Sequence, residues 1–201
     1  MTLDFEKIQD KQRIVIIGNE GTLEITRLAA HVLSFIKKPF DYAFISGEQQ
    51  LSDAPVILIQ GDDHIPEGSQ QANFHACRHH IAVIHHIEEI YPNEYLSFDD
   101  YIAQYEALGD KTPKGGTIIY NQEDNLATVI SAQKDREDVI LIEYESLTAT
   151  PTANGFTINN GPDITTPNTN FPSHAGAALT LLRRLGVTEA QFYEAIKTFK
   201  D

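Results

Sequence analysis

The chain has 201 residues, of which 41% are hydrophobic and 22% are charged, values typical of a globular protein with a buried core. It carries 15 Lys and Arg residues against 29 Asp and Glu residues, so its formal net charge is −14. A surface this negative repels phosphate backbones and anionic lipids, which argues against nucleic acid and membranes as partners. With a single cysteine, Cys77, the chain can form no internal disulfide.

Length and composition predict one domain, residues 1–201, in the cytoplasm. No stretch of the sequence is apolar for long enough to span a bilayer. Residues 1–11 are expected to form a charged leader, which lacks the apolar centre of a signal peptide.

Short apolar runs rich in β-branched residues alternate with segments of helical periodicity. The runs predict buried strands at residues 13–17, 56–59, 81–84, 117–120 and 139–142, and a weaker strand at 42–45. Helices are expected at residues 25–36, 98–108, 123–132 and 177–185, and a last helix opens with a capping box at Thr188. Fully apolar strands joined by helix-length connections are typical of a parallel sheet covered on both faces. The sequence therefore predicts a three-layer α/β domain with a mostly parallel sheet and helices on both faces.

The region after residue 139 departs from this alternation. Residues 155–158 are expected to form an edge strand, and residues 159–173 a long loop, because Asn, Thr and Pro dominate there. We therefore expect a small antiparallel addition near residues 139–158.

The turn after the first strand is a candidate phosphate site. In α/β proteins the helix that follows such a turn presents free N–H groups and the positive end of its dipole. A working phosphate loop also needs a Lys for the terminal phosphates and a Ser or Thr for Mg²⁺. Here the turn consists of Gly18, Asn19, Glu20, Gly21 and Thr22 and contains no Lys. Glu20 and the nearby Glu24 place negative charge where a phosphate would lie, so a tight turn without a ligand is the alternative.

A second candidate site follows the next buried strand. Asp62, Asp63 and His64 are metal-ligand types and lie at the carboxyl end of the expected sheet, where α/β folds bind ligands. A solvated acidic loop is the alternative. His85 and His86 end a later strand, and their side chains point to opposite faces because side chains alternate along a strand. The candidate metal ligands are thus Asp63, His64 and His86, but we expect no stoichiometric metal.

Taken in order, these segments resemble the Mur ligases of peptidoglycan synthesis, and most closely the branch that joins a murein tripeptide to UDP-N-acetylmuramate. The resemblance covers residues 12–201. Its most specific stretches are residues 113–121, which read Pro-Lys-Gly-Gly-Thr-Ile-Ile-Tyr-Asn, and residues 191–196, which read Gln-Phe-Tyr-Glu-Ala-Ile. Further similar stretches lie at residues 14–33, 57–63, 80–87 and 97–105.

The resemblance implies a P-loop-like central ATPase domain from a three-domain enzyme that uses ATP and Mg²⁺ to form an amide through an acyl phosphate. Where the family has Gly-Lys-Thr in its phosphate loop, this chain has Gly21, Thr22 and Leu23. The family's acidic pair is retained as Asp62 and Asp63. Of a later Gly-x-His-Asn pattern, only His174 is retained, and these three residues are the vestiges of the catalytic set.

These departures predict a degenerate Mur-ligase-like central domain that binds or regulates and does not catalyse, with neither ATP nor Mg²⁺ expected as a cofactor. Its partner would be another protein or other ligase domains. One alternative is a fragment or split component of an ATP-dependent, amide-bond-forming cell-wall ligase. Another is a metal-dependent hydrolase that uses the Asp/His cluster. Whichever of these functions holds, we expect one cleft at the carboxyl ends of the strands. Its lining residues would be Asn19, Glu20, Asp62, Asp63, His64, His86 and His174.

Overall fold

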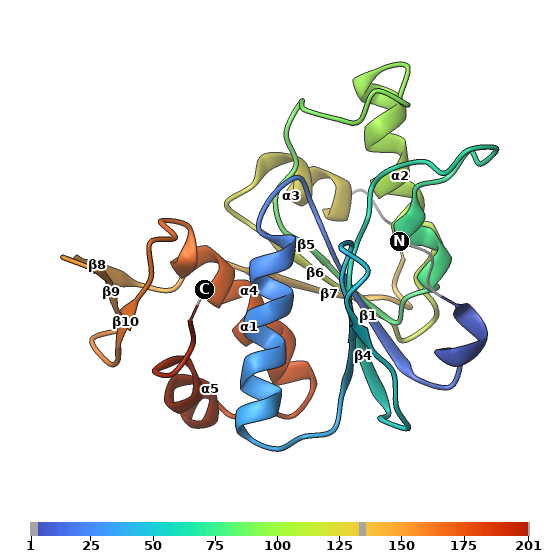
Figure 1. The fold of residues 1–201 in the computed structure, drawn as a ribbon. Helices are drawn as coiled ribbons and strands as arrows, with labels where there is room; N and C mark the ends of the chain where they lie inside the picture. Colours follow the sequence, from blue (N-terminus) through green and yellow to red (C-terminus); the bar gives the residue numbers. More distant parts are fainter. Residues whose placement is uncertain (1–3, 133–135, 201) are drawn as a thin grey trace.

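A seven-stranded sheet forms the centre of the molecule in the computed structural model, which describes residues 4–132 and 136–200 (Figure 1). Its strand order is β3-β2-β4-β1-β5-β6-β7. The strands are β1 (Gln12–Ile17), β2 (Asp41–Ala43), β3 (Gln49–Gln50), β4 (Val56–Gln60), β5 (Ile81–Ile84), β6 (Thr117–Asn121) and β7 (Ile140–Tyr144). All neighbouring pairs are parallel except β2 and β3. The expected mostly parallel sheet is therefore confirmed.

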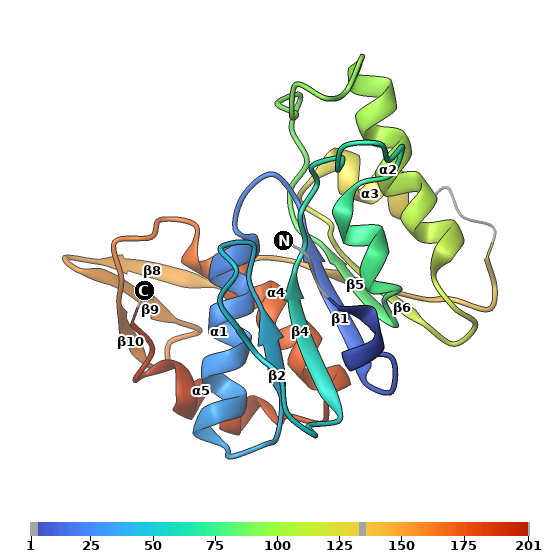
Figure 2. The same ribbon diagram turned by 45° about the vertical axis from the view of Figure 1, so that its right-hand side comes forward.

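Helices cover both faces of this sheet, which confirms the three-layer arrangement (Figures 1 and 2). One face carries α1 (Thr22–Phe35), α4 (Phe171–Arg184) and α5 (Glu189–Ile196), and the other carries α2 (Phe98–Lys111), α3 (Asn125–Ala132) and the 3₁₀ helix η2 (Asn73–Cys77). Alternate residues of β1 enter the two cores: Ile14 and Ile16 pack on the α1 side, and Val15 and Ile17 pack on the α2 side. The apolar runs are continuous because both faces of the strand are buried.

The antiparallel addition is a separate sheet of β8 (Ala149–Thr152), β9 (Gly155–Ile158) and β10 (Asp163–Thr165). Its expected extent, residues 139–158, is wrong, since it spans residues 149–165. Residues 155–158 form the middle strand and not an edge. Asn159 and Asn160 both have positive φ and lie in the turn between β9 and β10, where the N–H of Gly161 donates to the carbonyl of Ile158 at 2.8 Å. The expected loop at 159–173 thus contains a strand, and α4 begins inside it.

Two further expectations are corrected near the chain's C-terminal half. Residues 139–142 were expected to be buried, but β7 is an edge strand in which Ile140 is 41% exposed and Leu141 is 39% exposed. Helix α4 begins at Phe171, six residues before the expected start at 177, because Pro172 is tolerated in the first turn of a helix. The capping box at Thr188 is confirmed.

The expected leader is packed into the domain over its described part, residues 4–11. Ile8 is fully buried, and the buried ammonium of Lys11 lies 2.9 Å from a carboxylate oxygen of Asp41. Residues 1–3 of the leader lie outside the described residues. Within the part of the chain that the structure covers, no helix is long and apolar enough to cross a membrane.

Helix α4 approaches the backbone after β7 closely at Gly176. A Cβ at this position would overlap the carbonyl oxygen of Glu145. We predict that Gly176→Ala lowers the free energy of unfolding by about 1–3 kcal/mol through overpacking, although Ala is the better helix former. Thr180→Ala, one turn later and half-buried, is the matched control with a change of about 0.5 kcal/mol or less. Urea unfolding measures both, and a Gly176→Ala variant of unchanged stability would contradict this close approach.

Candidate functional site

Hydrogen bonds connect the turn between β1 and α1 to the segment that follows β5. The backbone N–H of Asn19 donates to the carbonyl of His86 at 2.8 Å, and its side-chain oxygen accepts from the N–H of Glu88 at 2.6 Å. Its side-chain amide donates to the carbonyl of Ile90. Gly18 has φ +146°, and a Cβ there would lie 2.7 Å from the carbonyl oxygen of His86. Both residues therefore serve to hold two loops together.

Two imidazole rings pack against Gly21, the residue before α1. A Cβ on Gly21 would lie 2.5 Å from Nε2 of His174 and 2.6 Å from Cδ2 of His85. The rings contact each other edge to face, with centroids 5.0 Å apart. Nδ1 of His85 hydrogen-bonds the hydroxyl of Tyr144 at 2.5 Å, and Nδ1 of His174 lies 3.1 Å from the side-chain amide of Asn168. The space beside this helix start is filled by His85, which follows β5, and by His174 of α4.

His85 brings little positive charge to the turn. His85 is 2% exposed, and burial, followed by the neighbouring His174 and His86, lowers its pKa to about 3. It is therefore neutral at physiological pH.

A pocket of about 380 Å³ opens in front of the turn. Glu20 and Glu24 line it, and Arg27 is its one basic residue apart from His174. Asn170 donates to the carboxylate of Glu20 at 3.1 Å. The pocket thus holds two carboxylates against one guanidinium, the opposite of the charge that a phosphate requires.

The hydroxyl of Thr22 faces the protein interior. Thr22 is buried, and its oxygen accepts from the side-chain amide of Gln60 at 3.2 Å. The oxygen of Gln60 in turn accepts from the N–H of Ile45 at 3.0 Å. This hydroxyl therefore links α1 to the end of β4.

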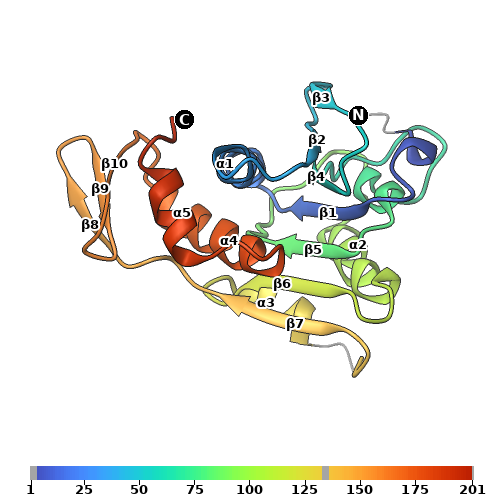
Figure 3. The same cartoon turned by 90° about the horizontal axis from the view of Figure 1, so that it is seen from below.

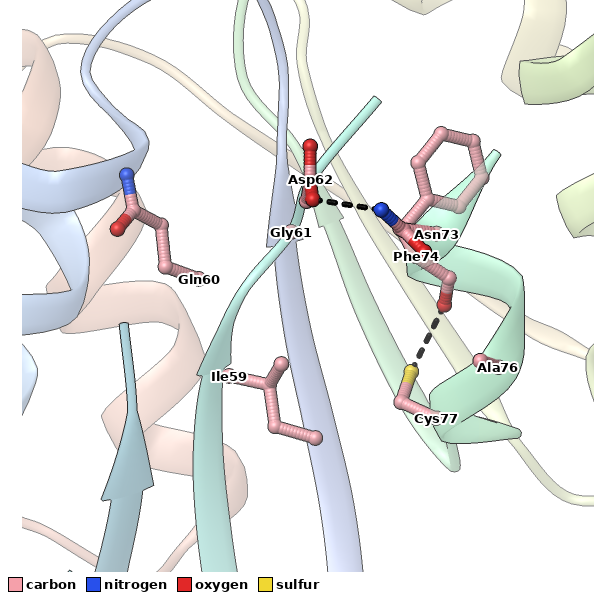
Figure 4. Close-up of a pocket in the computed structure, with 8 residues that line it drawn as sticks. All are labelled: Ile59, Gln60, Gly61, Asp62, Asn73, Phe74, Ala76 and Cys77. Atoms are coloured by element: carbon pink, nitrogen blue, oxygen red, sulfur yellow. Dashed lines mark hydrogen bonds between the residues drawn. The ribbon is translucent and has the colours of Figure 1, made fainter. Parts of the chain in front are cut away.

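Asp62 organises the loop that follows β4. One carboxylate oxygen accepts from Asn73 at 2.8 Å, and the other accepts from the backbone N–H of His64 at 3.2 Å. Burial raises the pKa of Asp62, but hydrogen bonds that include these two lower it, and the net pKa is below its ordinary value. The cavity beside it has a volume of only about 20 Å³, enough for about one water molecule (Figure 4).

Asp63 lies at the end of a chain of tyrosine hydroxyls. The hydroxyl of Tyr101 donates to its carboxylate at 2.9 Å and lies 2.8 Å from the hydroxyl of Tyr105. Burial raises the pKa of Asp63 above its ordinary value, and the hydrogen bond from Tyr101 offsets only part of that effect. Asp62, Asp63 and His64 offer ligand atoms within 4.8 Å of one another, so they are the described group that could hold an ion.

His86 belongs to a different cluster. Nε2 lies 2.8 Å from Glu88 and Nδ1 lies 2.7 Å from Asp124. Burial alone would lower the pKa of His86, but these two carboxylates raise it above its ordinary value. His85 and His86 do point to different surroundings, as the strand alternation predicts.

The seven residues expected in one cleft are thus divided among three places. Glu20 and His174 line the pocket at the first turn, Asn19 and His86 meet through the loop after β5, and the acidic pair with His64 lies after β4. Sequence reasoning missed His85 and Tyr144 as contributors to the turn. Tyr144 is 59 positions from His85, and no local pattern signals that pairing.

Three further buried groups, His75, His79 and Cys77, are uncharged at neutral pH. Burial lowers the pKa values of His75 and His79 to about 4 and raises that of the Cys77 thiol to about 12. The sulfur of Cys77 donates to the carbonyl of Phe74 at 2.9 Å (Figure 4).

The environment of His85 makes stability depend on pH. Below pH 6.5 the unfolded chain binds a proton at this residue, and the folded chain does not until about pH 3, so stability falls as the pH falls. The free energy of unfolding therefore falls between pH ~7 and pH ~5.5. We predict that this fall is smaller by about 1 kcal/mol in His85→Gln.

His86→Gln is the matched control, and its effect has the opposite sign. The pKa of His86 is higher in the folded chain than in the unfolded chain, so this residue stabilises the fold at low pH, and that stability is lost as the pH rises. Without His86, the free energy of unfolding therefore falls more steeply as the pH is lowered. Urea unfolding at both pH values measures each slope. An unchanged slope in His85→Gln would show that His85 is not buried in its neutral form.

Comparisons with known proteins find similarity to ligases named for UDP-N-acetylmuramate. No family model matches the chain. UDP-N-acetylmuramate–L-alanine ligase of Streptomyces avermitilis is 23% identical over 202 residues, which cover 92% of this chain and 43% of that protein. The chain therefore spans less than half the length of this curated relative.

Solved structures share the fold at lower identity. The UDP-N-acetylmuramate:L-alanyl-γ-D-glutamyl-meso-diaminopimelate ligase of Neisseria meningitides matches with a TM-score of 0.82 and 16% identity over 98% of this chain and 69% of its own. UDP-N-acetylmuramate–alanine ligase of Thermotoga maritima matches with a TM-score of 0.70 and 17% identity over 96% and 46%. Sequence and fold together confirm the similarity to the Mur ligase family, and the matching unit is that family's central domain.

Proposed function

We propose that this chain is a non-catalytic binding domain, related to peptidoglycan synthesis or recycling, that keeps the Mur ligase central fold without turning over ATP. It acts in the cytoplasm, and its partner is another protein or other ligase domains. The observation that carries the proposal is the turn at Gly21, where two imidazole rings and two glutamates occupy the surroundings of the helix start.

Steric and electrostatic arguments agree at this turn. A triphosphate needs open N–H groups and a fixed cation, and it gains much of its binding from charge-assisted hydrogen bonds. The first turn supplies Glu20 and Glu24, and the nearby His85 is neutral. Each lost phosphate contact removes on the order of 3 kcal/mol of transition-state stabilisation, so losing several together abolishes turnover.

The Mg²⁺ contacts are weakened in the same way. Leu23 stands where the family has its Mg²⁺ hydroxyl, and the carboxylates of Asp62 and Asp63 are engaged by Asn73 and Tyr101. The hydroxyl of the neighbouring Thr22 is engaged by Gln60 and does not replace it. A Mg²⁺ ion without phosphate partners keeps most of its water ligands. We therefore infer that the acidic pair now serves the structure of the loop after β4.

One alternative is a component of a split or longer ligase. The match to less than half of a curated amide-bond-forming ligase favours it, because the missing part of such a protein could supply further groups. A metal-dependent hydrolase is the other alternative, and the proximity of Asp62, Asp63 and His64 favours it. Neither alternative supplies the absent lysine at the turn.

Calorimetric titration of the dialysed chain with MgATP tests the proposal. We predict no saturable binding in the micromolar range, and elemental analysis of the same sample is expected to find no stoichiometric metal. Glu20→Gln with Glu24→Gln is the matched variant, and it should not create tight binding because the steric contact at Gly21 remains. A micromolar dissociation constant, which needs about 8 kcal/mol, would refute the proposal. One Zn²⁺ per chain that is lost in Asp63→Ala would favour the hydrolase.

A further inference from the structure

The two edges of the main sheet differ in kind (Figure 3). One edge is β3, which has two residues, Gln49 and Gln50, both exposed and polar. The other is β7, which has five residues with the sequence Ile-Leu-Ile-Glu-Tyr. Native edge strands are usually short or charged, which prevents pairing with other chains. The edge at β3 follows this rule, whereas β7 exposes both Ile140 and Leu141.

The pairing register shows which backbone groups β7 turns outward. Ile140 donates to Gly116, and the carbonyl of Tyr144 accepts from Gln122, so these residues face β6. In a parallel pair, every second residue bonds the neighbouring strand. Leu141 and Glu143 therefore turn their N–H and C=O groups away from β6. No strand in residues 4–132 and 136–200 pairs with that side.

An acidic groove of about 410 Å³ lies at the carboxyl end of β7. Glu143, Glu145 and Glu189 line it, together with Tyr144 and Tyr193. Its only cationic side chain, Arg183, is paired with Glu189. Glu189 compensates Arg183, so the groove keeps the negative charge of Glu145, whose carboxylate accepts from the side chain of Gln122 at 2.9 Å. The carboxylate of Glu143 lies on the other side of β7, 3.4 Å from the hydroxyl of Tyr120.

A second copy of the chain is a poor occupant of this edge. Antiparallel self-pairing about Ile142 would set Glu143 of one copy opposite Leu141 of the other and Glu145 opposite Val139, so neither carboxylate would meet a basic side chain. Each copy also carries a net charge of −14. A segment with Lys or Arg would instead complement the carboxylates of the groove.

We propose that β7 and its acidic groove form a docking site for an extended segment of a partner protein that carries apolar residues together with Lys or Arg. The segment adds a strand to the sheet through the outward groups of Leu141 and Glu143, and its basic side chains reach the groove. This inference rests on the proposed function, since it gives the binding domain a class of partner.

Selection from a displayed library of random peptides of about ten residues, with the full chain as bait, tests the proposal. We expect the enriched peptides to combine apolar residues with Lys or Arg. Leu141→Pro removes an outward N–H without removing a bond to β6, so it should weaken these peptides about tenfold or more. Leu141→Val keeps the N–H and an apolar side chain and is the matched control, with nearly unchanged affinity. Glu143→Gln with Glu145→Gln should weaken binding and reduce its dependence on salt.

Amide hydrogen exchange of the unaltered chain gives a readout that does not depend on any variant. Bound peptide should slow exchange at Leu141 and Glu143. The proposal is overturned by a selection that enriches nothing or enriches peptides without basic residues, or by exchange that is unchanged at these two amides. A dimer in sedimentation that Leu141→Pro dissociates would instead identify a second copy as the occupant. The MgATP titration is read separately, so binding of ATP refutes the non-catalytic function, and loss of peptide binding alone refutes only the docking site.

Discussion

The contact of His85 and His174 with Gly21 joins four elements of the fold at one point. Gly21 precedes α1, His85 follows β5, His174 belongs to α4, and Tyr144 at the end of β7 holds the ring of His85. Gly21 has φ +73°, and a side chain there would also collide with the rings, so only glycine satisfies both constraints. This packing fixes the first turn in a closed form, and the neutral state of His85 follows from its burial there.

Much of the fold could be predicted because buried parallel strands have an unmistakable composition. The runs at β1, β4 and β5 are apolar on both faces, and helix-length segments separate them. The run at β7 looks the same in sequence, yet it lies at an edge. Strand order depends on contacts distant in sequence, so periodicity alone could not distinguish an edge strand from a central one.

The candidate site was predicted less completely for a related reason. The absence of a lysine and the presence of two glutamates are local facts that the sequence carries at the turn. The alternation of side chains along a strand is also a local property, and it predicts that His85 and His86 face different surroundings. The hydrogen bond between His85 and Tyr144 and the ring contact with His174 join segments far apart in the chain, and only the three-dimensional packing reveals them.

Tyr144 connects the two regions of functional interest. Its hydroxyl hydrogen-bonds His85 at the turn, and the residue also lines the acidic groove at the end of β7. The proposed docking site thus uses the sheet as a rigid support for its exposed strand edge. In this account internal contacts occupy the helix start at Gly21, and binding takes place at the β7 edge and the groove at the carboxyl end of that strand.

The amide resonances of Gly21, Thr22 and Leu23, followed while MgADP is added to the full chain, test the closed turn most directly. The contacts of Gly21 with the two imidazoles predict that these resonances keep their positions up to millimolar nucleotide. Saturable shifts confined to the turn at micromolar nucleotide would show that it still holds phosphate, and would contradict the account.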